Sequence, residues 1–157
     1  MTTDAPINDS AALTTWIEQR YHQTHRQQLP ELATLSLKVE RVHGDHPQAP
    51  AGLGALLQHL IGELEVHMKK EELILFPAIR RGGGPGIENP IAVMRADHDD
   101  HQAEVAQIRA ITNNLTLPEG ACRSWTALYE GVGEFLDDLD AHIRLENEVL
   151  FPRFEPA

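Results

Sequence analysis

The sequence is poor in cysteine, in aromatic residues and in positive charge, and each shortage excludes a class of protein. Cys122 is the only cysteine among 157 residues, so one chain forms no internal disulfide and holds no cysteine-ligated zinc or iron–sulfur site. Aromatic residues make up only 5% of the chain. The apolar content is mostly leucine, isoleucine, valine and alanine, which favours packed helices over a β-sandwich.

Charge and hydropathy narrow the possible partners. Asp and Glu number 24 against 13 Lys and Arg, giving a net charge of -11. A surface this acidic repels phosphate groups, so we expect neither nucleic acid nor membrane as a partner. No apolar stretch approaches the roughly 20 residues that span a bilayer. Residues 1–10 lack the positive start and apolar run of a signal peptide, and the sequence therefore predicts a cytoplasmic protein.

The chain length suggests one domain, and clusters of glycine and proline divide it into helical segments. Helices are predicted over about 10–43, 51–80, 90–111 and 118–151, with Ser10 as the first N-cap. Pro30 is expected to kink or restart the first helix, because proline removes a backbone donor. The predicted fold class is all-α, an antiparallel up-down-up-down four-helix bundle over residues 10–157. A disordered tail is predicted over residues 1–9.

A duplicated motif carries the strongest chemical signal. His67 precedes Glu71 by four residues, His142 precedes Glu146 by four, and each glutamate is followed after three residues by Leu-Phe-Pro. Residues four apart share one face of a helix. Each copy therefore directs an imidazole and a carboxylate to the same side, and two such faces turned toward each other would hold two metal ions.

Pairing antiparallel helices about their turns brings further histidines to the same level. His22 falls level with the region of Glu71, and Glu71 falls level with His98. His142 fits more loosely, about two turns away. Each of the four helices is thus predicted to contribute one histidine, and two of them add a carboxylate. The candidate metal ligands are His22, His67, Glu71, His98, His142 and Glu146.

The remaining histidines are expected to differ in role. His43 lies roughly 31 Å from His22 along a continuous helix, so one dinuclear centre uses both only if Pro30 reverses the chain, and His43 is the weaker candidate for an additional ligand. His101 follows His98 by three residues and is a candidate fifth histidine ligand. His25 lies one turn from His22 and is a candidate partner for a ligand's second ring nitrogen. Two others are expected to be exposed or structural: His46 and His59.

Three acidic residues near the predicted ligands have two open interpretations. Glu63 and Asp138 each precede a candidate histidine by one turn, and Asp97 adjoins another. Each either accepts a hydrogen bond from a ligand's free N–H or is a solvated charge. Cys122 is expected to pack rather than to act in redox chemistry.

The donor set indicates which metals fit. Four imidazoles and two carboxylates suit two first-row transition metals, whereas calcium and magnesium prefer shells made only of oxygen. A structural zinc site normally closes with four ligands, so six shared ligands favour a dinuclear centre.

Several stretches together resemble a known family. They are Arg20-Tyr21-His22, Leu29-Pro30-Glu31-Leu32, residues 38–43, His67-Met68, residues 70–72, residues 74–77, Asp97-His98-Asp99, Thr112-Asn113-Asn114, His142 and Leu145-Glu146-Asn147. The pattern resembles the hemerythrin-like HHE cation-binding domain. More narrowly, it is similar to the di-iron iron–sulfur cluster repair proteins, also called repair of iron centres proteins. The resemblance covers nearly the whole chain from about residue 10.

This resemblance implies two iron ions in a non-haem centre, bridged by Glu71 and Glu146, with the four histidines as terminal ligands. Such a site should attract an oxo or hydroxo bridge. Family members act in nitrosative and oxidative stress and help to repair damaged iron–sulfur clusters by donating iron, by handling nitric oxide, or both. Iron–sulfur proteins are then the expected clients, and NO and O2 the expected small molecules. Longer members carry an N-terminal domain with a cysteine pair, whereas this sequence has only Cys122.

Two other functions remain open at this stage. A hemerythrin-type carrier or sensor would bind O2 or NO reversibly, but hemerythrin has two histidines four apart in its third helix, and His98 and His101 are three apart. An enzyme that reduces NO or removes peroxide would need an electron donor, and the sequence contains no flavin or haem motif. Whether the protein is an enzyme is left undecided.

Overall fold

The computed structural model describes residues 4–156, and every regular element within them is a helix. The elements of the first half are α1 (Ser10–Ile17), η2 (Glu18–His22), α2 (Gln23–Val42), α3 (Leu53–Lys70), η3 (Glu71–Leu75) and α4 (Phe76–Arg80). Those of the second half are α5 (Glu88–Ile111), α6 (Arg123–Arg144), η4 (Leu145–Leu150) and η5 (Phe151–Phe154). The predicted all-α class is therefore confirmed.

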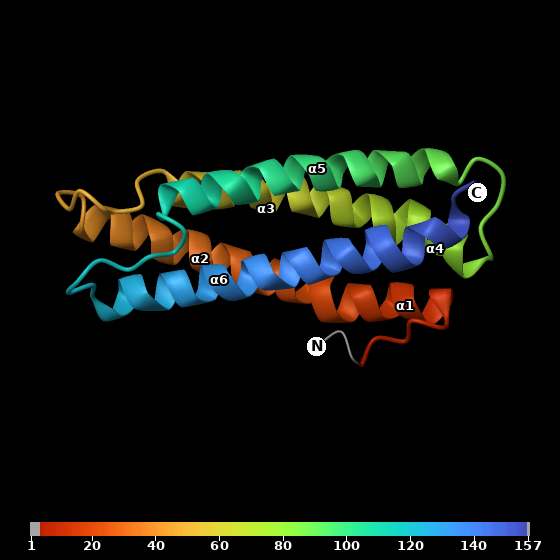
Figure 1. Cartoon of the computed structure of the whole chain (residues 1–157), viewed down its shortest axis with the longest axis horizontal. Helices are drawn as coiled ribbons and strands as arrows, with labels where there is room; N and C mark the ends of the chain where they lie inside the picture. The colour runs from red at the N-terminus through yellow and green to blue at the C-terminus, as the bar shows by residue number, and fades with distance from the viewer. Residues whose placement is uncertain (1–3, 157) are drawn as a thin grey trace.

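The long helices lie side by side (Figure 1). Helix α2 packs against α3 and α6, and α3 packs against α5. The α2–α3 and α5–α6 connections lie at one end of the molecule, and the connection leading into α5 lies at the other. This helical bundle brings residues from distant parts of the sequence to the same level.

Helix boundaries differ from the prediction where side chains cap a helix. Asp9, not Ser10, is the N-cap of α1, and its carboxylate accepts a hydrogen bond from the backbone N–H of Ala12. Helix α6 begins at Arg123 rather than near residue 118, because Cys122 is its N-cap and accepts from the backbone N–H of Trp125. Cys122 thus has a structural role at a helix end.

Of the two outcomes expected at Pro30, a restart of the helix is excluded, since α2 runs from Gln23 to Val42 with Pro30 inside it, and a kink stays a prediction. An interior proline costs about 3 kcal/mol because one backbone hydrogen bond is lost. Leu29 and Leu32 beside it are buried, and each contributes about 2 kcal/mol by leaving water. Packing on both sides of Pro30 therefore outweighs its local cost.

Three segments of π-helix interrupt the α-helices, and all three carry candidate ligands. Segment η2 ends at His22, η3 begins at Glu71, and η4 contains Glu146. A π-helical turn holds one more residue than an α-helical turn, and such turns occur frequently at functional sites. The helix pattern of the sequence gave no indication of these insertions.

Two apolar clusters lie on either side of the candidate ligands. The first includes Leu64 and Met68 on α3, and the second includes Leu75 on η3, so Glu71 lies between them. On the last helix, Leu139 belongs to the first cluster and Leu145 to the second, with His142 between them. The candidate ligands therefore occupy a polar layer enclosed by apolar packing.

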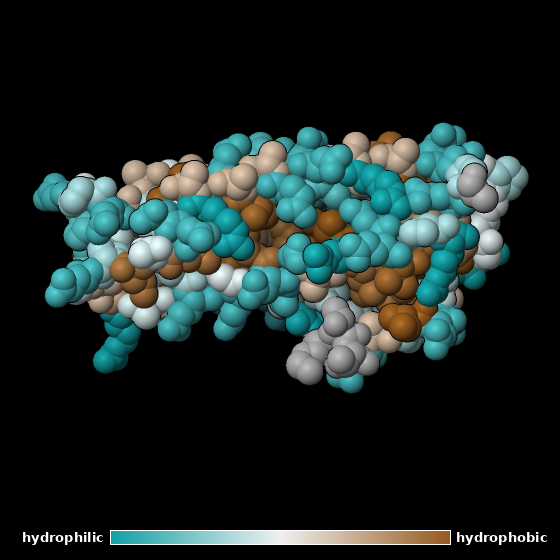
Figure 2. Space-filling view, in the orientation of Figure 1, coloured by the Kyte–Doolittle hydropathy of each residue, from teal (hydrophilic) through white to brown (hydrophobic). Residues whose placement is uncertain are grey.

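Figure 2 shows hydrophilic side chains over most of one face, with hydrophobic ones visible in the groove between α5 and α6. Among residues 4–156, no helix has both the length and the apolar character needed to cross a membrane. The predicted disordered tail, residues 1–9, falls partly outside the described residues. Within 4–9, Ala5 packs against the second apolar cluster, and the prediction of disorder remains untested.

Candidate metal centre

All six candidate ligands meet in the middle of the bundle. They come from η2, α3, η3, α5, α6 and η4, so each long helical stretch contributes to the layer. Each residue is at most 2% exposed. Burying charged or polar groups is costly unless they are paired, so a buried layer of four imidazoles and two carboxylates requires an explanation beyond packing.

The six side chains form two overlapping groups of four. One group comprises His22, Glu71, His142 and Glu146, and the other comprises His67, Glu71, His98 and Glu146. Within each group, one donor atom from every residue lies within 4.8 Å of the others. Both groups share the two carboxylates, which is the arrangement that two neighbouring cations with bridging carboxylates require.

The Nε2 atoms of the histidines point at these carboxylates. His22 Nε2 lies 3.0 Å from Glu71 Oε1, and His142 Nε2 lies 2.9 Å from Glu146 Oε2. His98 Nε2 lies 2.9 Å from Glu146 Oε1 without hydrogen-bond geometry. His67 Nε2 lies farther away, at 3.6 Å from Glu71 Oε1. The edge of each ring that carries Nε2 is thus directed at the centre of the layer.

The Nδ1 atom of every ring is held by a different neighbour. His22 Nδ1 lies 2.7 Å from Glu72 Oε2, and His67 Nδ1 lies 3.0 Å from Asp97 Oδ2. The other two pairs are His98 Nδ1 with Asn147 Oδ1 at 2.8 Å and His142 Nδ1 with His25 Nε2 at 3.2 Å. An acceptor at Nδ1 fixes the proton there and leaves the Nε2 lone pair free for a metal.

Some of these partners were predicted and some were missed. The placement of His25 against a candidate ligand agrees with the prediction, and Asp97 contacts His67 rather than its neighbour His98. Glu63 instead pairs with His59, and Asp138 pairs with Arg20.

The missed partners, Glu72 and Asn147, occupy equivalent positions in the duplicated motif. Each directly follows a glutamate of the centre and reaches a histidine on a neighbouring helix. The repeat itself was therefore the signal in the sequence that could have identified them.

The other histidines lie outside both groups. His101 is buried, and its ring centroid lies 5.0 Å from that of His67, but it belongs to neither set. His43 lies near the start of α6, where its Nε2 is 3.1 Å from Cys122 Sγ. His46 packs edge-on against Trp125. These positions agree with the expectation that His43 and His46 do not reach the centre.

Burial favours the neutral form of the histidines, but nearby Glu146 outweighs it at His98 and raises the pKa of that imidazole. Burial lowers the pKa of His67 to about 3 and the pKa of His25 to about 2, so both imidazoles are neutral at physiological pH. Burial and the adjacent charge of Glu146 raise the pKa of Glu71 well above its usual range. Neutral imidazoles are the form that binds metals, and a cation between the two carboxylates would remove the repulsion that holds a proton on Glu71.

The residues present fit a pair of metal ions. Four buried atoms of the layer have no hydrogen-bond partner among the described residues: His67 Nε2, His98 Nε2, Glu71 Oε2 and Glu146 Oε1. With Nδ1 of the neutral His67 donating to Asp97, its Nε2 lone pair faces a carboxylate oxygen. Two acceptors that face each other in a dry interior are stabilised by a cation between them.

Two phenylalanine rings close the layer on the side of the second apolar cluster. The ring of Phe76 lies parallel to that of His22, with centroids 5.8 Å apart, and the ring of Phe151 lies parallel to that of His98 at 5.9 Å. Both phenylalanines are fully buried. They follow equivalent copies of the duplicated motif, so the two halves of the centre are enclosed alike.

Comparison with known proteins agrees with this architecture. The family described as the hemerythrin HHE cation binding domain matches residues 15–154. The chain belongs to this family of cation-binding helical domains.

The curated relatives are more specific. The chain is 52% identical over 141 residues to a protein of Yersinia pseudotuberculosis serotype O:1b (strain IP 31758) named iron-sulfur cluster repair protein YtfE. The same identity and length hold for the protein of that name from Yersinia pestis (strain Pestoides F). These alignments cover 90% of this chain and 64% of each relative, so the chain spans less than two thirds of the relatives' length.

Proposed function

We propose that the layer holds a carboxylate-bridged di-iron centre, with Glu71 and Glu146 between two iron ions. The terminal ligands would be His22 and His142 for one ion and His67 and His98 for the other. The sharing of both carboxylates by the two groups of four supports this assignment. The alternating positions of the helix connections support the antiparallel up-down-up-down arrangement of the bundle (Figure 1).

On this basis, we propose that the protein helps to repair iron–sulfur clusters damaged by nitrosative or oxidative stress. The similarity to relatives named as iron–sulfur cluster repair proteins supports this function. Iron in the centre would supply a metal that can be donated and that binds NO. The client proteins would be apo or damaged iron–sulfur proteins, and the cytoplasm is the compartment in which we expect the repair.

The protein's own residues would control access and ligand basicity. The acceptors at Nδ1 keep each ring in one tautomer and one orientation, and the rings of Phe76 and Phe151 exclude water from one side of the layer. The carboxylates offset the positive charge of the metal ions in a dry environment. These features favour metal ions that are held by oriented imidazoles and carboxylates and shielded from water on one side.

A reversible O2 or NO carrier is less well supported. That function was expected to use a fifth histidine, for which His101 was the candidate, and His101 lies outside both groups. A carrier would form a stable O2 adduct in its reduced form and retain its iron in the presence of an acceptor protein. The repair function predicts the opposite behaviour.

The test compares iron content, visible absorption and iron transfer in the wild type, Glu71→Leu and Glu146→Leu. Glu148→Leu is the matched control, because Glu148 is an exposed glutamate of η4. We expect about two iron ions per chain in the wild type and the control, and loss of iron in the two variants. The wild type should also restore the cluster of an apo iron–sulfur protein when inorganic sulfide and a thiol reductant are supplied. Iron that reaches no acceptor and does not react with NO would exclude the repair function.

A further inference from the structure

A second cluster of potential metal ligands lies outside the buried centre. His59 and Glu63 on α3 and Glu104 on α5 each offer a donor atom, and the three atoms lie within 4.8 Å of one another. His59 and Glu63 are four residues apart on one face of α3, with His59 Nε2 2.9 Å from Glu63 Oε1. None of these residues belongs to either group of the proposed di-iron centre.

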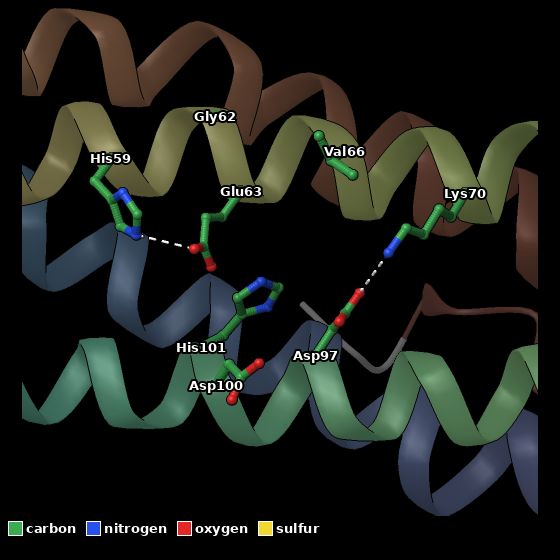
Figure 3. A pocket seen from close by; sticks show the side chains of 8 residues that line it. All are labelled: His59, Gly62, Glu63, Val66, Lys70, Asp97, Asp100 and His101. Atoms are coloured by element: carbon green, nitrogen blue, oxygen red, sulfur yellow. Dashed lines mark ion pairs between the residues drawn. The ribbon is translucent and has the colours of Figure 1, made fainter.

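The cluster adjoins a pocket of about 490 Å³ between α3 and α5. Figure 3 shows His59 and Glu63 at one end of this pocket, Asp97 at the other, and His101 between Glu63 and Asp97. The side chain of His59 is 60% exposed, so this end is open to solvent. At the other end, Lys70 Nζ lies 3.6 Å from Asp97 Oδ2.

A buried and unsatisfied carboxylate distinguishes this cluster from an ordinary acidic surface. Glu104 is only 7% exposed, and its Oε2 has no hydrogen-bond partner among the described residues. A buried carboxylate oxygen without a donor is costly, and surface glutamates avoid that cost by facing water. Neighbouring His101, which is 2% exposed, also has an unpartnered atom, Nδ1. An unpartnered imidazole nitrogen on a residue that lines the pocket and an unpartnered carboxylate oxygen beside it both lack a ligand.

The electrostatics of Glu104 indicate which kind of ligand is missing. Burial and the adjacent carboxylate of Glu63 raise the pKa of Glu104 to about 7. The position between the two carboxylates therefore favours positive charge. A divalent cation would satisfy both oxygens at once.

We propose that His59, Glu63 and Glu104 bind one divalent first-row transition-metal ion next to the di-iron centre. One imidazole and two carboxylates suit Fe²⁺, Mn²⁺ or Zn²⁺ better than Ca²⁺ or Mg²⁺, and the open side of the pocket leaves room for water ligands. This assignment revises the expectation that His59 is merely exposed or structural.

Two side chains connect the proposed site in the pocket to the proposed di-iron centre. Asp97 and His101 both line the pocket, and both contact His67 of the centre, through a hydrogen bond and through ring packing respectively. An ion in the pocket is thus separated from the ligands of the centre by one layer of side chains. The use of this site for iron rests on the proposed function, whereas cation binding there does not.

The experiment titrates Mn²⁺ into protein whose centre has already been loaded with iron and oxidised, and follows free Mn²⁺ by electron paramagnetic resonance. The variants are Glu104→Gln and His59→Gln. Asp100→Asn is the matched control, because it removes a charge from the same pocket without removing a proposed ligand. Iron content is measured on every sample before the titration.

We expect the wild type and Asp100→Asn to bind one Mn²⁺ per chain beyond the iron already present. Binding should weaken by about tenfold or more in Glu104→Gln and His59→Gln, while their iron content stays at the wild-type level. Normal iron content without additional Mn²⁺ binding in the wild type, or equal binding by all variants, would overturn this site alone. Loss of iron from the wild type would instead count against the proposed function, so the two failures are distinguishable.

Discussion

His25 on α2 and His142 on α6 contact each other ring to ring, with His25 Nε2 3.2 Å from His142 Nδ1. In the absence of metal, His142 Nε2–H donates to the Glu146 carboxylate; with a metal ion on Nε2, its Nδ1–H would instead donate to His25 Nε2. His25 therefore holds a ring of the proposed centre without belonging to it. This pair joins two helices that are far apart in the sequence.

Replacing His25 should weaken metal binding without removing a ligand. We expect His25→Leu to lower iron affinity about 10- to 100-fold, because His142 loses the acceptor that fixes its tautomer. His25→Gln should restore part of the affinity, since its amide oxygen accepts a hydrogen bond. Iron retention against a competing chelator is the measurement. Equal retention by the wild type and His25→Leu would show that the contact has no such role.

Glu72 provides a graded version of the same test. Its Oε2 lies 2.7 Å from His22 Nδ1, and both of its oxygens accept from Arg26. Glu72→Ala should reduce iron affinity about 10- to 100-fold, whereas Arg26→Gln should have a smaller effect because the acceptor at His22 remains. Metal titrations of the two variants provide the comparison. A larger loss in Arg26→Gln than in Glu72→Ala would contradict this order.

Metal removal should reverse the effect of Glu71 on stability. In the metal-free protein Glu71 is a buried carboxylate beside Glu146, and the pKa of Glu71 is raised well above its usual range by burial and by that neighbour. Glu71→Gln should therefore leave the free energy of unfolding of the metal-free protein unchanged or raise it by about 1 kcal/mol. The same substitution should lower the stability of the iron-loaded protein. Chemical denaturation of both forms, with Glu148→Gln as control, decides the point.

Glu104 should make the metal-free protein less stable as pH rises. Burial and Glu63 raise the pKa of Glu104 to about 7, above its ordinary value of 4.5. Of the other charged neighbours, His59 lowers this pKa and Asp100 raises it. The folded state therefore binds the proton more tightly than the unfolded state. The resulting stability is complete below about pH 4.5 and is lost as pH rises toward 7, by about 1.4 kcal/mol per unit of the pKa difference.

The variant Glu104→Gln isolates this contribution. Its advantage in unfolding free energy over the wild type should grow between pH 5 and pH 8, a range of pH that brackets the raised pKa. Asp100→Asn serves as the control for loss of a nearby charge. Parallel pH profiles for the wild type and Glu104→Gln would mean that Glu104 titrates as an ordinary surface carboxylate.

Local signals in the sequence were sufficient to predict that the chain is helical and which six side chains meet in the buried layer. The glycine and proline clusters marked the connections, and the His-to-Glu spacing of four placed each pair on one helix face. Pairing helices about their turns then brought His22 and His98 to the same level. Metal binding by these residues stays a prediction, although the structure brings all six together.

The partners of the histidines were harder to predict because they depend on how the helices are rotated against one another. Glu63 and Asp138 were chosen for being one turn from a histidine on the same helix, but the partners found for all four rings come from neighbouring helices. One inserted residue in a π-helical turn rotates everything after it by about 100°. Such a rotation leaves no mark in the hydrophobic pattern.

The complete burial of the six side chains has a consequence for how quickly metal can be exchanged. A bulky chelator does not reach ligands that are at most 2% exposed while the bundle is closed. Iron in the proposed centre would then leave only during brief local separations of the helices, whose frequency is a property of the protein. The rate of iron release should therefore level off as the chelator concentration rises, and the plateau would measure the opening rate of the bundle itself.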